Sequence, residues 1–155
     1  AELADAVGDR PLAGLLAAEA LRVHDWRPRA GFDTDHRSIV HELDWLRTAV
    51  HLHKGCYRGQ ETVARVHNLG RPPRRIVHLH LDGSDHVVPE RGSSVFVAGA
   101  GDGGGGGRPV GYLATVARHY EDGPIALAVI KRSTPVDAEL DIEGIRAAQT
   151  VIVAP

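Results

Sequence analysis

The hydrophobic residues near the start of the chain recur with the period of an α-helix. This pattern predicts an amphipathic helix from Pro11 to Val23, with Asp9 as a candidate N-cap and Pro11 in the first turn. The segment Arg27-Pro28-Arg29 is expected to end the helix. The apolar stripe of this helix consists of Leu12, Leu15, Leu16, Ala20 and Val23.

A second amphipathic helix is predicted from about Tyr57 to His67. Between the two helices the sequence indicates loops and short elements, with a single helical turn over residues 41–46. The segment Gly70-Arg71-Pro72-Pro73 then interrupts any regular structure and is the best candidate for a domain boundary.

After this boundary the hydrophobic period changes from 3.6 to 2. Short alternating runs separated by Asp-Gly and Gly-rich turns predict a compact antiparallel sheet or barrel. In the first run His78 and His80 are expected to face solvent, and the Gly-rich segment 99–107 is expected to form a hairpin tip. The predicted strands cover residues 76–81, 95–97, 110–116, 125–131 and 150–153.

Together these patterns predict an α+β protein, in which a short helical and irregular N-terminal portion packs on a C-terminal antiparallel β-barrel. The two predicted domains are residues 1–72 and 73–155. Of the 155 residues, 43% are hydrophobic and 25% are charged, which is typical of a soluble globular protein. One cysteine excludes an internal disulfide framework, and no apolar run approaches the roughly 18 residues that cross a bilayer. We therefore expect a cytoplasmic protein without membrane association.

The most distinctive motif surrounds the single cysteine. Gly55 and Gly59 flank Cys56 and allow the backbone to bend and to approach another group. At the start of a helix and near basic side chains, the pKa of this thiol is expected to be lowered and its nucleophilicity raised. The alternative is a cysteine that is buried as a small hydrophobic residue. The full motif is Lys54-Gly55-Cys56-Tyr57-Arg58-Gly59-Gln60-Glu61.

This motif, followed by Arg65, resembles the signature of the YgfZ-type folate-binding proteins. These are relatives of the glycine cleavage system T-protein that help to maintain iron–sulfur proteins. The resemblance extends over the chain from about Leu12 to Leu140, although Val40 stands where the family usually has proline. Its flanking parts are Leu21-Arg22-Val23 through Asp33-x-Asp35, Ile39-x-His41-Glu42, Gly70 to Arg75, and Lys131-Arg132.

The resemblance implies a protein that binds tetrahydrofolate or a related folate and supports the assembly or repair of iron–sulfur enzymes, with tRNA modification affected indirectly. It implies that Glu42 contacts the pterin ring and that Arg65 contributes to the cofactor site. Folate and iron–sulfur client proteins are the expected partners. Cys56 is the expected reactive centre, and the residues expected to shape its surroundings are Lys54, Tyr57, Gln60 and Glu61.

Two other functions remain open at this point. The first is a folate-dependent aminomethyl or methyl transferase like the T-protein, although that relative lacks the cysteine signature. The second is a barrel that serves only as a protein-docking module. The sequence contains no set of nucleophile, base and orienting group that would form a self-sufficient catalyst. Because the N-terminal half that forms much of the family's folate pocket has no counterpart here, we expect an incomplete pocket and interpret the chain as a C-terminal portion.

Metal and nucleic-acid sites are not predicted. His51 and His53 could chelate a metal if they lay on a strand, but no second ligand cluster accompanies them. Asp33 and Asp35 are assigned to capping or turn formation rather than to a cation. The basic surplus from Lys54 to Arg75 would suit an anionic partner such as a folate glutamate tail or RNA phosphates, or it is a solvated loop. With a net charge of −2, we expect no direct nucleic-acid binding.

Overall fold

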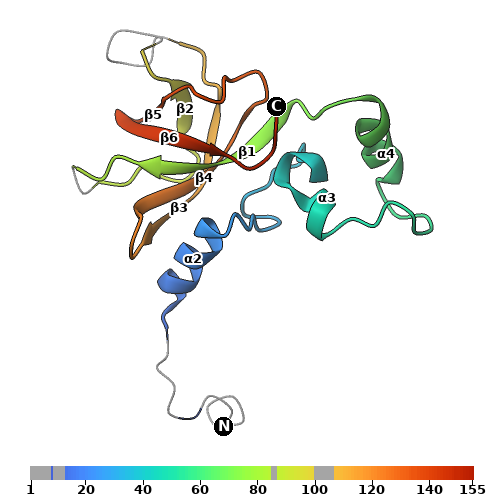
Figure 1. The fold of residues 1–155 in the computed structure, drawn as a ribbon, viewed down its shortest axis with the longest axis horizontal. Helices are drawn as coiled ribbons and strands as arrows, with labels where there is room; N and C mark the ends of the chain where they lie inside the picture. The colour runs from blue at the N-terminus through green and yellow to red at the C-terminus, as the bar shows by residue number, and fades with distance from the viewer. Residues whose placement is uncertain (1–7, 9–12, 85–86, 100–106) are drawn as a thin grey trace.

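The computed structural model describes residue 8 and residues 13–84, 87–99 and 107–155. Figure 1 shows an antiparallel barrel built from the second half of the chain, with the helical segments of the first half lying against it and beside it. The predicted α+β class, with a C-terminal antiparallel barrel, is confirmed. No helix in the described ranges has the length and apolar character needed to span a membrane.

The helices are those that the sequence predicts, with shifted ends. Helix α2 spans Leu15–His24 and begins after Gly14, so the predicted N-cap and the proline of the first turn lie outside the described residues. The predicted single turn is a 3-10 helix, η1 (Val40–Leu43), followed by the short helix α3 (Trp45–Thr48). Helix α4 spans Gln60–Leu69, three residues later than the predicted start.

Six strands close into one barrel in the order β1-β4-β3-β2-β5-β6. The sequence predicted four of them closely and the last only at its C-terminal end. It missed β5, because three residues are too few to display a period. The central part of the predicted hairpin tip, residues 100–106, lies outside the described residues. The strands are β1 (Arg74–Leu81), β2 (Ser94–Val97), β3 (Gly111–His119), β4 (Gly123–Lys131), β5 (Leu140–Ile142) and β6 (Ile145–Val151).

Where β1 and β4 form the wall of the barrel, both the inner and the outer face of the sheet are buried. The barrel interior is filled by aliphatic side chains from all six strands, such as Val77 and Leu79. On the outer side, Val23 of α2 and Leu43 of η1 pack against Ile76 and neighbouring residues of β3 and β4. The expectation that His78 faces solvent is therefore wrong, since only 3% of it is exposed. His80, one pleat further along the same face, is exposed as predicted.

Helix α2 is fixed to the barrel at its C-terminal end. Arg22 donates a 2.7 Å hydrogen bond to Asp33 and a 3.1 Å hydrogen bond to Thr115 of β3, and Thr115 donates to Asp33. Asp33 also accepts from the Arg29 N–H, so of the predicted capping or turn roles the structure shows a turn-forming one. The other end of the helix departs from the predicted stripe, because Leu15 and Leu16 are 77% and 86% exposed.

Candidate functional site

The cysteine motif forms an exposed loop that leads into α4. Gly59 has a φ of +84° and is the N-cap of the helix, a conformation that glycine adopts without strain. This left-handed residue explains why the helix starts at Gln60 rather than at Tyr57. Cys56 lies in the loop and is exposed, so the alternative of a buried hydrophobic cysteine is wrong.

The residues expected to surround Cys56 are spread over the loop and the first turn of α4. The ammonium group of Lys54 lies 5.7 Å from the centre of the Tyr57 ring, within the range of a cation–π contact. The Tyr57 carbonyl accepts a 3.2 Å hydrogen bond from the Gln60 N–H. Glu61 occupies the first turn of α4, where the helix dipole favours a carboxylate.

Arg65 lies one turn further along the exposed side of α4. Among the described residues it forms no ion pair with Glu61, although the spacing would allow one. The Cys56 thiol likewise has no hydrogen-bond partner in the ranges that the structure describes. The loop therefore presents a thiol that solvent and other molecules can reach.

Glu42 has a different environment from the cysteine loop. Only 1% of it is exposed, and both of its carboxylate oxygens accept hydrogen bonds from the Arg74 guanidinium, at 3.1 and 2.8 Å. Arg74 also pairs with Asp35 at 2.8 and 3.1 Å. These hydrogen bonds, chiefly those from Arg74, hold the pKa of Asp35 well below its usual range, and the two carboxylates raise the pKa of Arg74.

Asp35 also accepts hydrogen bonds from the Arg37 N–H and the Ser38 hydroxyl, both at 2.9 Å. The prediction that Asp35 has a turn-forming role is thereby confirmed. Together, Asp35, Glu42 and Arg74 join the irregular segment before η1 to the first strand of the barrel.

The structure brings the His41-Glu42 segment close to α4. The rings of His41 in η1 and His67 in α4 lie 6.3 Å apart. His41 is buried, and neither of its ring nitrogens has a hydrogen-bond partner among the described residues. Burial, together with the positive charge that His67 can carry, lowers the pKa of His41.

An open groove lies elsewhere on the barrel, between Arg71, Arg132 and the loop that follows β4. It encloses about 590 Å³ and has Arg71 bonded to the Pro155 carbonyl at 3.0 Å. None of the residues expected at the thiol or folate site lines this groove. Fewer basic side chains are free to meet an anionic partner than the residue count from Lys54 to Arg75 suggests. Arg75 is fully buried, and Arg74 is paired with Asp35 and Glu42.

One group of chemically suitable side chains was missed by the sequence reasoning. His24, His119 and Asp122 offer ligand atoms that all lie within 4.8 Å of one another. The chain separates His24 from the other two by almost a hundred positions, and no short-range spacing could have revealed the group. By contrast, His51 and His53 lie in a loop rather than on a strand, with their rings 6.3 Å apart and edge to face.

Comparison with known proteins adds no relative to this description. No family model matches the sequence, and no curated protein shows significant similarity to it.

Proposed function

We propose that this chain belongs to a folate-binding protein of the YgfZ type, which supports the assembly or repair of iron–sulfur enzymes and thereby affects tRNA modification. The proposal rests on the resemblance of the motif from Lys54 to Glu61. The observation that supports it best is the exposure of Cys56 at the centre of that motif. A thiol reserved for packing would be buried, whereas a thiol that meets a cluster or a client protein must be accessible.

The single cysteine limits the chemistry. Iron–sulfur clusters are usually held by four protein ligands, so Cys56 alone cannot form a resident cluster site. In the proposed function it contacts an iron or sulfur atom of a client transiently. Lys54 and Tyr57 constrain the loop through their cation–π contact, and Gln60 and Glu61 begin the helix that supports it.

The proposed folate site involves Glu42 and Arg65. A carboxylate suits the amino and ring N–H groups of a pterin, and an arginine suits the carboxylates of a glutamate tail. Each carboxylate oxygen can accept more than one hydrogen bond, so Glu42 can serve a pterin while it remains paired with Arg74. Because Glu42 is almost fully buried, this contact requires a local opening of the segment around η1.

The test is made in cells that lack the gene for this protein and receive the complete gene with single substitutions. Cys56→Ser is expected to abolish the recovery of iron–sulfur enzyme activity. The matched control is Thr62→Ala, an exposed residue in the first turn of α4 that is not part of the motif. Equal protein levels and equal melting temperatures make the comparison valid. Full activity of the Cys56→Ser protein would overturn the proposed role of the thiol.

A further inference from the structure

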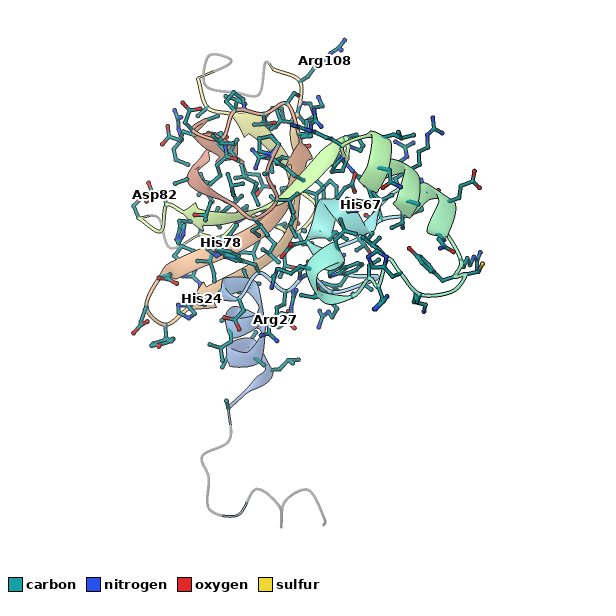
Figure 2. The ribbon with its side chains drawn as sticks, turned by 45° about the vertical axis from the view of Figure 1, so that its right-hand side comes forward. His24, Arg27, His67, His78, Asp82 and Arg108 are labelled. Atoms are coloured by element: carbon teal, nitrogen blue, oxygen red, sulfur yellow. The ribbon has the colours of Figure 1, made fainter. Side chains whose placement is uncertain are left out.

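Three potential metal ligands converge where α2 meets the β3–β4 hairpin. His24 is the last residue of α2, His119 is the last residue of β3, and Asp122 lies in the turn before β4. One carboxylate oxygen of Asp122, Oδ2, lies 3.1 Å from Nδ1 of His119 and 3.5 Å from Nε2 of His24. Figure 2 shows His24 at this junction, with His78 of β1 on the same side of the molecule.

Two of the three ligand separations are close to the edge length of a tetrahedral zinc site, and the third lies within 4.8 Å. With zinc–nitrogen and zinc–oxygen bonds of about 2.0–2.1 Å, two ligands of a regular tetrahedron are about 3.3–3.4 Å apart. The two measured distances of 3.1 and 3.5 Å lie on either side of that value. Two imidazoles and one carboxylate are also a donor set that zinc uses when its fourth position is open to solvent.

The local structure fixes the three side chains before any ion binds. Val23, next to His24, is fully buried against the barrel, and Arg22 is bonded to Asp33 and Thr115. The rings of His24 and His119 are stacked, with centroids 4.6 Å apart and planes 11° from parallel. Gly123, at a φ of +69°, closes the turn that carries Asp122. The ligands therefore stand on three elements that are already packed together.

The shortest separation in this group joins His119 to Asp122. An unprotonated ring nitrogen and a carboxylate oxygen at 3.1 Å repel each other unless a proton or a metal ion lies between them. A proton on Nδ1 leaves the buried His119 ring neutral when its Nε2 is unprotonated, whereas a metal ion at this position would join His119 to both Asp122 and His24. The Asp122 N–H also lies 3.3 Å from the same Nδ1, and zinc bound at Nδ1 would replace this hydrogen bond.

The buried His78 of β1 interacts electrostatically with this group of side chains. Only 3% of the His78 surface is exposed, and its Nε2 has no hydrogen-bond partner in the described ranges. Burial lowers the pKa of His78 to about 4, helped by the charges that His80 and His24 can carry and opposed by Asp122. A neutral His78 places no positive charge next to the three side chains.

We propose that His24, His119 and Asp122 form a zinc-binding site between α2 and the β3–β4 hairpin, with the fourth position open to solvent. The site would fasten the N-terminal helix to the barrel. It is separate from the cysteine motif and does not depend on the function proposed for that motif.

Calorimetric titration of the metal-free protein with zinc chloride tests this proposal. One zinc ion is expected to bind per chain, and His24→Gln and Asp122→Ala are each expected to weaken binding at least tenfold, since even an outer-shell change costs 10–100-fold. Both residues are exposed enough that their replacement should leave the fold intact, which melting curves in a chelator will verify. The matched control replaces both His51 and His53 by glutamine and is expected to bind zinc as the unchanged protein does.

Cobalt(II) gives a second readout that reports geometry. A four-coordinate site produces intense visible absorption, and this absorption is expected in the unchanged protein and in the His51/His53 control but not in Asp122→Ala. Three results would each overturn the proposal: no zinc binding to the unchanged protein, undiminished binding in both ligand variants, or loss of binding in the His51/His53 control. In those cases the three side chains form a hydrogen-bonded polar cluster only.

Discussion

The Arg74 guanidinium donates hydrogen bonds to both carboxylate oxygens of Glu42, at 3.1 and 2.8 Å. This contact joins the first strand of the barrel to η1. It also changes the meaning of any experiment on Glu42, because a substitution there removes a structural ion pair together with a candidate folate ligand. Stability and binding must therefore be measured on the same variants.

Glu42→Ala is expected to destabilise the fold by about 2–3 kcal/mol. The substitution removes a buried carboxylate and leaves Arg74 with Asp35 as its remaining partner. Asp35→Ala is expected to cost less, about 1 kcal/mol, because a third of the Asp35 side chain is exposed. Urea denaturation of both variants checks the order. A larger loss for Asp35→Ala would mean that Glu42 is not the principal partner of Arg74.

This chain by itself is expected to bind tetrahydrofolate weakly. The Glu42 carboxylate is buried and engaged, and none of the residues expected at the folate site lines the open groove of the barrel. Calorimetric titration with tetrahydrofolate should give no saturable signal at micromolar concentrations. Tight one-to-one binding would show that the pocket is complete within these residues.

Cys56 is expected to react with alkylating reagents without unfolding of the protein. Its exposure allows direct attack, and Lys54 stands nearby in the loop. We expect faster modification by iodoacetamide at neutral pH than for glutathione, measured by mass spectrometry. Cys56→Ser should change the free energy of unfolding by no more than about 0.5 kcal/mol, as for most exposed positions. Protection of the thiol until the protein unfolds would contradict the exposed placement.

His41 is expected to make the fold sensitive to mild acid. Burial lowers its pKa in the folded state below the ordinary value of 6.5, so between these two values the unfolded chain binds more protons than the folded one. This contribution to stability is present above pH 6.5 and is lost as the pH falls below it. Denaturation curves at pH 7.5 and 5.5 should therefore show a smaller drop for His41→Phe than for the unchanged protein. An equal drop in both proteins would remove His41 as a source of the acid sensitivity.

Gly111→Ala is expected to destabilise the barrel by at least about 3 kcal/mol. A Cβ atom there would lie 2.2 Å from the Val129 carbonyl oxygen and 2.7 Å from the Ile130 Cα, both of which are backbone atoms of the neighbouring strand. Gly55→Ala is the matched control, since a Cβ at that position meets nothing within 4 Å. Circular dichroism melting curves will compare the two, and similar curves would mean that β3 and β4 can separate without cost.

The sequence predicted an element correctly where its hydrophobic residues follow a single period. The change of period after Pro73 correctly indicated the start of the barrel, and the continuous apolar run of β4 reflects burial on both of its faces. The same two-sided burial misled the interpretation of His78. Alternation along β1 identifies two faces, but it does not reveal that α2 lies close to the second face.

The site residues were predictable only as far as they are close in sequence. The loop from Lys54 to Gly59 and the first turn of α4 follow from local chemistry, because glycine and helix-start preferences act over a few positions. The pairing of Glu42 with Arg74 and the meeting of His24 with Asp122 depend on how distant elements pack. A single sequence contains no signal for such contacts.

The order of strands in the closed ring has a consequence for how the protein is made. Strand β1 is synthesised first, yet its two neighbours in the barrel are β4 and β6, with Arg74 opposite Lys131 and Val77 opposite Val151. During translation, β1 therefore has no strand partner on either edge until most of the barrel has been synthesised. Pairing between such distant segments slows folding, and a waiting strand rich in valine, isoleucine and leucine invites association with other nascent chains. The closed ring therefore leaves β1 as the strand that stays unpaired for the longest part of synthesis.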